Sequence, residues 1–409
     1  MITPQQFYKQ FFCFFMAAAC LPSLAADSAT DTHVRFGSLD FATGKALFKK
    51  NWVPAPASTS ASDGLGPLYN ARSCNQCHPD GGRGSREASL VFHINDPVYG
   101  QQLQRYAVAG LPREAVLNQT ERYAGQNSEL SYAEIKITEL SYGPMVNNAV
   151  SARLAPALFG LGMLEKIADK DLLALADEAD SNGDGISGRL NIIVNEQGDS
   201  HIGRFGWKAS QMSLDDQLGR ALGLDLGLGN PRYSSAVGDC TPAQQACLDA
   251  PNGNSLHHDD LEVNQLVLDL LLIYVRELPQ PAGLHSASDS SPAQAGKNLF
   301  QKTGCAACHV PDIAVEDVTI HPYSDLLLHD MGMGLADTLN EGDVAGYEWR
   351  TSPLWGLGKN DGELLHDGRA SSVHQAILWH GGEAAAARDN YLGLQASERN
   401  DLILFLNGL

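Results

Sequence analysis

Two short stretches decide how this chain folds: Cys74-Asn75-Gln76-Cys77-His78 and Cys305-Ala306-Ala307-Cys308-His309. Each has the C-x-x-C-H spacing that attaches c-type haem. The two thiols of such a run can add across the two vinyl groups of one haem, and the histidine that follows can bind the iron as its proximal ligand. The pattern therefore predicts two covalently bound haem c groups, with His78 and His309 as proximal ligands.

Two other interpretations use the same cysteines. Four cysteines in two C-x-x-C pairs can hold one structural zinc ion, and a lone pair can act as a redox dithiol. Neither explains why a histidine follows both pairs directly. Haem attachment therefore remains the stronger interpretation.

A second repeat accompanies the motifs. Gly44–Lys50 resembles Gly296–Lys302, and each segment precedes a C-x-x-C-H run. In the second copy Ser291-Pro292 is typical of a helix start, whereas in the first a Pro-, Ser- and Gly-rich stretch at 51–70 separates helix from motif. Internal repetition of a module predicts the same fold twice. We therefore expect a mainly α protein with two cytochrome c-like domains, the first enlarged by inserted loops and helices.

Helical periodicity and linker composition divide the chain. The apolar segment 261–278 predicts a buried helix that ends before Pro279, and the stretch 279–291, rich in Pro, Ser and Gly, predicts a linker. Another helix, capped by Ser397, is expected at the C-terminus. The expected parts are a signal peptide at 1–25, an enlarged first domain at 31–285 with one haem and a calcium-like loop, and a second domain at 286–409 with the other haem.

The N-terminus has the features of an export signal. Lys9 precedes an apolar run at 11–19, and small residues allow cleavage after Ala25 or Ala26. The run is short for a membrane span, although a retained anchor and lipid attachment at Cys20 are alternatives. We expect a periplasmic protein that does not span the membrane once the signal is removed.

The cysteine count agrees with export. Of eight cysteines, Cys13 and Cys20 leave with the signal and four carry haem, so Cys240 and Cys247 remain. An oxidising compartment lets such a close pair form a disulfide. Bacterial c-type haem is also attached outside the cytoplasm.

The charge balance bears on partners. With 28 Lys and Arg against 48 Asp and Glu, the net charge is −20, which argues against binding nucleic acid, whose phosphates need basic side chains. An acidic surface suits a basic redox protein or a cation, or only keeps an exported protein soluble. The expected partners are a small-molecule oxidant or substrate and a periplasmic electron donor or acceptor protein.

One loop resembles the first half of a calcium-binding loop. Asp180, Asn182 and Asp184 place oxygen side chains at positions one, three and five, and Ile186 offers a carbonyl at position seven. The twelfth position is Asn191 instead of a bidentate glutamate, so a standard EF-hand is not expected. The two alternatives are a bound Ca²⁺ and an Asx/Gly turn without an ion.

Each haem iron has a sixth position, which favours electron transfer when filled and binding of peroxide or oxygen when empty. For the second haem, His380 is our first candidate and His366 the next, followed by Met331 and Met333; His374 lies in the same half. Taken alone, any of these histidines is as compatible with a hydrogen-bonded structural role.

The first haem is assigned no distal ligand, which makes it the candidate peroxide site. The nearest downstream histidine, His93, lies in an apolar stretch and is expected to be packed there. A peroxide site needs a general base. Apolar neighbours would raise the pKa of Glu165 and suit it to this role, with Glu139 as a weaker rival. The alternative for Glu165 is a solvated position at a helix start.

Five larger side chains have candidate roles around the haems. Trp207, Trp355 and Trp379 could pass electrons between the haems or simply pack in the core. Arg350 and Arg369 match the geometry of haem propionates or form surface ion pairs.

At this point the sequence resembles the di-haem oxidoreductase family, also labelled thiol oxidoreductases and similar to bacterial di-haem cytochrome c peroxidases and the MauG group. The resemblance covers most of the mature chain and rests on the segments 74–79, 155–165, 184–189, 204–209, 323–332, 352–358 and 365–370. The thiol label gains no support, because no spare reactive cysteine pair is evident.

The resemblance implies two facing cytochrome c-like domains, with calcium often between them in the peroxidase relatives. In the peroxidase and MauG relatives the residue that matches His380 is Met or Tyr and binds the second iron. A histidine there departs from both and would lower the haem potential relative to Met.

These observations favour a periplasmic di-haem oxidoreductase, peroxidase-like, in which the haem on His78 activates peroxide or oxygen and the haem on His309 relays electrons. The first alternative is a non-enzymatic electron-transfer cytochrome in which both irons have six ligands. The second is a redox partner in periplasmic iron handling.

Overall fold

The computed structural model describes residues 28–59, 61–124, 130–195, 197–256, 259–281, 291–359 and 362–409. The predicted signal peptide at 1–25, with Cys13 and Cys20, lies outside these ranges, as do residues 282–290 of the predicted linker and the expected domain boundary at 285/286. Residues 40–409 form one compact unit. Within the described ranges, no helix is both long and apolar enough to cross a membrane.

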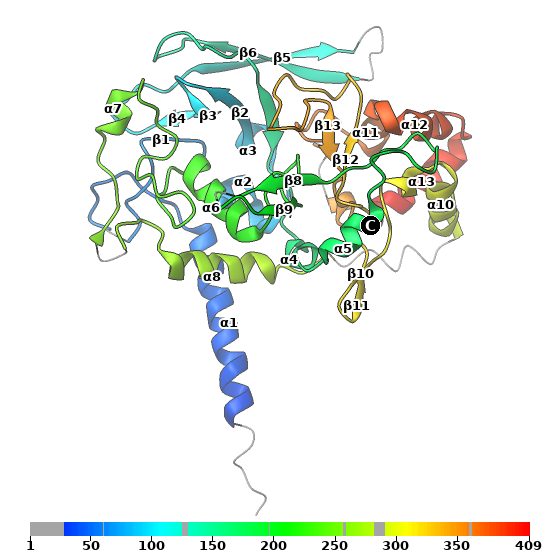
Figure 1. The fold of residues 1–409 in the computed structure, drawn as a ribbon, viewed down its shortest axis with the longest axis horizontal. Coiled ribbons are helices and arrows are strands. Elements are labelled where there is room, and N and C mark those ends of the chain that lie inside the picture. The colour runs from blue at the N-terminus through cyan, green and yellow to red at the C-terminus, as the bar shows by residue number, and fades with distance from the viewer. Residues whose placement is uncertain are drawn as a thin grey trace, which may run out of the picture. The chain divides into compact units, whose positions relative to one another are not determined.

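The helices are short apart from a few that frame the two motifs (Figure 1). They are α1 (Ser28–Lys49), α2 (Cys74–Cys77), α3 (Arg86–Ser89), α4 (Leu161–Glu165), α5 (Asp169–Leu175), α6 (Leu214–Asp225), α7 (Gln245–Leu248), α8 (Gln265–Arg276), α10 (Ser291–Lys302), α11 (Val373–Trp379), α12 (Ala385–Leu392) and α13 (Ala396–Asn407).

The expectation of a mainly α protein is wrong, because the chain is 32% helix and 19% strand. The described strands form one three-stranded sheet and five pairs. The three-stranded sheet is β3 (Gly100–Leu103), β2 (Leu90–Asp96) and β7 (Ser151–Leu154); the pairs are β1 (Leu68–Tyr69) with β4 (Tyr106–Ala107), β5 (Val116–Tyr123) with β6 (Ser131–Thr138), β8 (Asn191–Val194) with β9 (Ser200–Gly203), β10 (Ile313–Val315) with β11 (Val318–Ile320), and β12 (Leu328–Asp330) with β13 (Glu348–Arg350).

The strands were missed because most are too short to show a period. The longest pair, β5 and β6, forms a hairpin along the top of Figure 1. Its second strand alternates charged and apolar side chains around Ile135 and Ile137, which pack on the core below. Such a period-two pattern is the signal of a half-buried strand, but here it is confined to one segment of a long insertion.

The repeated segment of the sequence marks two equivalent helix crossings. On α1, a Cβ atom at Gly44 would lie 2.1 Å from the carbonyl oxygen of Leu270 on α8. On α10, a Cβ atom at Gly296 would lie 2.2 Å from the carbonyl oxygen of Asp401 on α13. Each repeat therefore supplies a glycine that lets a later helix pack directly against the first helix of its module. The terminal helix is confirmed, although Gln395 caps it instead of Ser397.

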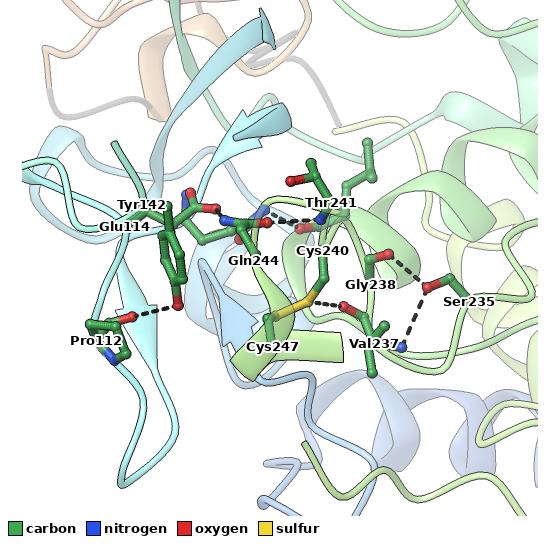
Figure 2. The surroundings of a disulfide bond; sticks show 12 residues. Pro112, Glu114, Tyr142, Ser235, Val237, Gly238, Cys240, Thr241, Gln244 and Cys247 are labelled. Carbon is green, nitrogen blue, oxygen red and sulfur yellow. Dashed lines mark hydrogen bonds between the residues drawn. A yellow bond between two sulfur atoms is a disulfide. The ribbon is translucent and has the colours of Figure 1, made fainter. Parts of the chain in front are cut away.

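The predicted pairing of the two remaining cysteines is confirmed: Cys240 and Cys247 form a disulfide, with Cα atoms 5.9 Å apart (Figure 2). The ring that it closes contains Gln244, whose amide donates to the buried carboxylate of Glu114 over 2.5 Å. The disulfide therefore lies where Gln244, just before α7, is hydrogen-bonded to Glu114 in the segment that follows β3.

Candidate functional site

The first motif forms a single helical turn, α2, that Ser73 caps at its N-terminus. Directly after it, Nδ1 of His78 lies 2.8 Å from the carbonyl oxygen of Pro156. A carbonyl only accepts, so Nδ1 carries the proton and Nε2 keeps a free lone pair. Burial lowers the pKa of His78 to about 4. The imidazole is therefore neutral at physiological pH, and the hydrogen bond on its far nitrogen holds it in the form that binds a metal.

The second motif repeats this arrangement. The amide of His309 donates to the carbonyl of Cys305 over 3.0 Å, and Nδ1 lies 2.9 Å from the carbonyl oxygen of Tyr323. Burial again lowers the pKa of His309 to about 4. Both histidines that follow the cysteine pairs are thus half-buried, neutral and left with a free Nε2.

The cysteines of the motifs are free thiols. Burial raises the pKa of Cys74 and that of Cys77 to about 12. In the described part of the chain, the cluster whose ligand atoms lie within 4.8 Å of one another is Cys308, Asp325 and His329. The four cysteines do not converge there, and the alternative of one zinc site built from both pairs does not hold.

Both motifs open into the same cavity, which has a volume of about 660 Å³. Its lining includes all six motif residues, namely Cys74, Cys77, His78, Cys305, Cys308 and His309. Near the first motif the wall is completed by Phe48 and Leu271, and near the second by Phe300 and Leu406. The two attachment sequences, more than 200 residues apart in the chain, therefore meet in one mostly apolar chamber.

His380 lies in this cavity at the end of α11. Its Nδ1 is 2.7 Å from the carbonyl oxygen of Ala376, which again leaves Nε2 free. Its charge is among the causes that lower the pKa of His309, after burial, so the two imidazoles lie near one another. The structure thus brings together the proximal histidine of the second motif and the first candidate for its sixth ligand.

His366 lines the same cavity. Its ring stacks on Trp349, with centroids 3.7 Å apart, and meets the edge of Trp207 at 6.5 Å. Its carbonyl accepts from the amide of Leu154 over 2.6 Å, only two residues before the partner of His78. His366 therefore forms part of the cavity wall near the first motif as well as near the second motif.

The other candidate ligands divide by position. Met331 and His93 line the cavity. Met333 is 82% exposed, and the ring of His374 is bonded to the hydroxyl of Tyr391 over 2.7 Å; neither lines the described cavity. The expectation that His93 packs beside an apolar stretch fits its place on β2, where burial holds its pKa well below the usual range.

Among the tryptophans, Trp207 and Trp355 line the cavity, whereas Trp379 does not. Trp379 packs instead under the guanidinium of Arg369, 4.8 Å from its ring centroid. Of the three candidates, Trp207 and Trp355 are therefore the ones that face the cavity between the motifs.

Two guanidinium groups, that of the buried Arg350 and that of the half-buried Arg83, lack a carboxylate hydrogen-bond partner in the described chain. Arg350 donates to the carbonyls of Gly206 and Thr351, and burial lowers its pKa to about 10. Arg83 donates to the carbonyls of Glu363 and Leu365, and burial likewise lowers its pKa to about 10.

Both of these arginines line the cavity. Carboxylates act on both cations without hydrogen-bonding to them: Asp325 raises the pKa of Arg350, and Glu363 and Asp367 raise that of Arg83, against the effect of burial. Each guanidinium is suited to an anionic group of a cavity ligand, as the propionates of a haem would be. Arg369, the other predicted partner, is already paired with Asp367 over 2.8 Å.

Glu165 occupies a different place from the one predicted. Its carboxylate is paired with Arg276 over 2.6 Å and accepts from the amide of Leu214 at the start of α6. Burial alone would raise its pKa, but these bonds lower it. The described cavity lining does not include it. The sequence argument failed because it saw apolar neighbours in the chain and not the arginine that α8 brings alongside. Glu139 is exposed and lies near Arg113.

Three carboxylates do line the cavity: Asp184, Asp225 and Glu383. None was singled out from the sequence as a group that faces the haems. Asp225 ends α6, a helix that carries no haem-related motif, so only the cavity that it shares with Cys74 and Cys77 reveals it.

A buried ionic cluster adjoins the second motif. His329 is bonded to Asp325 over 2.9 Å and to Glu383 over 2.7 Å, and lies 3.6 Å from the sulfur of Cys308. Burial lowers the pKa of His329, but its hydrogen bonds to Asp325, Cys308 and Glu383 raise it to about 12. His329 is therefore a cation between two carboxylates. One of these, Glu383, lies three residues after His380 in the chain.

The calcium-like loop closes on its own backbone. Asp180 accepts from the amide of Gly185, Asn182 from that of Asp184, and Asp184 from that of Ile186. These are the contacts of Asx turns. They neither require nor exclude a bound Ca²⁺. The loop also reaches the second motif, because the next residue, Ser187, donates to Glu383.

The family described as "Di-haem oxidoreductase, putative peroxidase" matches residues 36–98 and 144–409. The chain belongs to this family. The match omits residues 99–143, which in this di-haem oxidoreductase carry β3 to β6. As a member of the family it has haem as its cofactor and a redox role, in keeping with the two histidine sites of the cavity.

Comparison with individual proteins adds less. No curated protein matches the chain. Among solved structures, hydrazine synthase of Kuenenia stuttgartiensis is 13% identical with a TM-score of 0.42, over 98% of this chain and 100% of that one. A MauG-like protein associated with microbial copper homeostasis is 15% identical with a TM-score of 0.32, over 59% and 89%. Both scores are below 0.5, so the family match alone identifies this di-haem oxidoreductase.

Proposed function

We propose that this chain is an exported, periplasmic oxidoreductase with two covalently attached haem c groups and a peroxidase-like activity. The observation that carries the proposal is that both C-x-x-C-H motifs line one cavity, each with a half-buried, neutral histidine whose Nε2 is free. The thiols of Cys74 and Cys77 would hold one haem, and those of Cys305 and Cys308 the other. A haem at such a site supplies a redox-active iron that exchanges electrons and, where a coordination position is free, binds peroxide or oxygen.

The two sites differ in their surroundings, which supports a division of labour. His380 is among the groups that act on the pKa of His309, whereas no histidine is among those that act on His78. We assign the second site, with His309 and His380 as ligands, to electron relay. The first site, with His78, is assigned to peroxide or oxygen. Arg83 and Arg350 would bind propionates, and the apolar wall would exclude bulk water.

The alternative of a pure electron-transfer cytochrome, including one that serves periplasmic iron handling, also has an observation in its favour. The ring of His366 has no hydrogen-bond partner in the described part of the chain, and it faces the cavity near the first motif. If His366 binds the first iron, both sites are closed to peroxide.

Electron paramagnetic resonance of the ferric holoprotein distinguishes these functions. The enzyme should show one high-spin and one low-spin haem, and His380→Ala should remove the low-spin signal while His366→Ala leaves it. Peroxide should be consumed with a one-electron donor present. Two low-spin haems that do not react with peroxide would reject the enzymatic function, and loss of one signal in His366→Ala would then identify the electron carrier. Mass spectrometry should show two haem-sized additions to the chain.

We propose separately that Asp180, Asn182 and Asp184 bind Ca²⁺. It is supported by the oxygen spacing of the loop and by the link from Ser187 to Glu383 beside the second site. Isothermal titration of the chelator-treated holoprotein with CaCl₂ tests it, with Asp180→Asn expected to abolish the binding heat.

A further inference from the structure

Asp225 is unlike the other carboxylates around the cavity. It lines the cavity beside Cys74 and Cys77, and after burial its charge is the next cause that raises the pKa of both thiols. Its Oδ1 is buried and has no hydrogen-bond partner in the described chain. Asp184, in contrast, is bonded within its loop, and Glu383 is bonded to His329. Asp225 is therefore the cavity carboxylate that keeps one oxygen uncommitted at the first motif.

Two buried amides, those of Gln102 and Asn70, form a hydrogen-bonded chain beside the carboxylate of Asp225. Gln102 hydrogen-bonds to the carboxylate. The carbonyl oxygen of the Gln102 side chain accepts from Asn70 over 3.1 Å, so its NH₂ group is the part that remains to donate. The side-chain oxygen of Asn70 in turn accepts from the amide of Arg105 over 3.1 Å. Gln102 and Asn70 are 3% and 2% exposed, so this chain of bonds fixes the direction of the carboxylate.

The position of Asp225 in the fold also favours proton exchange. It is the last residue of α6, where the helix dipole opposes a negative charge. Burial raises its pKa to about 6, against the bond from Gln102 and the charge of Arg220, which lower it. Its carboxyl group therefore exchanges its proton near neutral pH.

Other charged or titratable groups face this region. They are Arg220 on α6, Arg105 after β3, Cys74 and Cys77 on α2, and Asp239, whose oxygen is bonded to the amides of Gln101 and Gln102. In the holoprotein the two thiols would be thioethers that do not titrate.

We propose that Asp225 is the proton-transfer residue for a small oxidant bound at the first motif, with hydrogen peroxide as the chemical class. The inference rests on the proposed function. Reduction of H₂O₂ to two H₂O consumes two protons and two electrons. Asp225 gives one of these protons: its O–H bond breaks as an O–H bond forms on the departing oxygen of the peroxide. Solvent water supplies the second proton and restores that of Asp225, and the two electrons come from an electron-donor protein through the second site.

The binding of cyanide by the ferric holoprotein tests this step without turnover. Hydrogen cyanide must lose its proton as it binds as cyanide, and the ionised carboxylate of Asp225 accepts that proton. Stopped-flow absorption should show that Asp225→Asn slows binding by roughly 10²-fold, the usual scale of general acid–base catalysis. The wild-type rate should rise with pH through a value near 6, and the variant should lack this rise. Asp225→Glu, which keeps the acid, should recover most of the rate.

Asp239→Asn is the matched control, because the side-chain oxygen of Asn can still accept from the amides of Gln101 and Gln102. Burial also raises the pKa of Asp239 to about 6, yet the described cavity lining does not include it. This variant should keep the pH dependence. Haem content and the ferric absorption spectrum of each variant show whether the site is intact.

Peroxide consumption should fall in parallel with cyanide binding. If Asp225→Asn keeps the wild-type rate and pH profile of cyanide binding, or if Asp239→Asn slows binding equally, the role of Asp225 is rejected while the proposed function stands. A wild-type protein that neither binds cyanide nor consumes peroxide overturns the proposed function together with it. If Asp225→Asn fails to take up haem, the comparison of Asp225→Glu with Asp239→Asn decides: a Glu variant without a pH-dependent rate also rejects the role.

Discussion

The glycine at each helix crossing gives a prediction that joins stability to the two haem sites. At Gly44 a methyl group would lie 2.1 Å from the carbonyl oxygen of Leu270 and 2.9 Å from Cβ of Tyr274, whereas ordinary contact begins at 3.4 Å. Backbone cannot rotate away, so α1 and α8 would have to separate by about 1 Å in a closely packed interior. We expect Gly44→Ala to lower the free energy of unfolding by about 1–2 kcal/mol, since an overpacking cost of 1–3 kcal/mol exceeds the gain in helix propensity.

Gly37 supplies the control on the same helix, because nothing in the described structure lies within 4 Å of a Cβ atom there. Gly37→Ala should therefore gain about 1 kcal/mol of helix propensity without a clash. Urea unfolding of the holoprotein, followed by far-UV circular dichroism, measures both variants. Equal stability of Gly44→Ala and wild type, or an equal loss in Gly37→Ala, would refute the assignment of Gly44 to a close crossing.

The same crossings lead to the cavity. Phe48 on α1 and Leu271 on α8 line it near the first motif, and Phe300 on α10 and Leu406 on α13 line it near the second. Gly44→Ala should thus shift the absorption and midpoint potential of the first haem, and Gly296→Ala those of the second. Spectra that change for the opposite haem, or for both equally, would contradict this placement.

Three other perturbations have definite outcomes. Replacing Cys240 and Cys247 by serine should lower the free energy of unfolding by about 2.5 kcal/mol, the loop-entropy value for a ring this short, and reduced wild type should match the variant in urea. The pKa of His329 is raised from 6.5 to about 12, so the contribution of its positive charge to the free energy of unfolding is complete below pH 6.5 and is lost as pH rises towards 12. The difference in unfolding free energy between wild type and His329→Gln should therefore shrink with rising pH, and a difference that stays constant would contradict this. Arg350→Met should lower the midpoint potential of one haem in a redox titration, since a nearby cation disfavours the oxidised iron, whereas Arg369→Met, already neutralised by Asp367, should change it less.

Local spacing predicted those features whose chemistry is complete within a few residues. The C-x-x-C-H runs specify two equivalent histidines, and the structure gives both the same hydrogen-bonding state. The repeated Gly44 and Gly296 segments indicated equivalent modules, and each glycine marks an equivalent crossing. The pair Cys240 and Cys247 needed only proximity in the chain and an oxidising compartment.

Properties set by distant neighbours were not predictable in this way. Apolar neighbours in sequence suggested a raised pKa for Glu165, but Arg276 on α8 and the start of α6 lower it instead. Asp225 also has apolar neighbours in sequence, Leu224 and Leu226, and there burial does raise the pKa. A pKa depends on what surrounds a group in space, so the same local pattern gives opposite shifts: Glu165 meets Arg276 from a distant helix, whereas no ion pair forms at Asp225 in the described chain.

The contacts of the first motif show why distal residues cannot be assigned by their half of the chain. Arg83, five residues after His78, donates to the carbonyls of Glu363 and Leu365, about 280 residues further on. The strand that leads to the partner of His78 likewise bonds to the carbonyl of His366. The segment 363–366 therefore forms part of the wall of the first site, although it lies downstream of the second motif. His366 was ranked as a ligand of the second haem because it follows Cys308 in sequence, yet its backbone is anchored beside the first. Of the two histidines ranked highest, His380 is thus the one whose surroundings point to the second iron, and the spectrum of His366→Ala reports on the first.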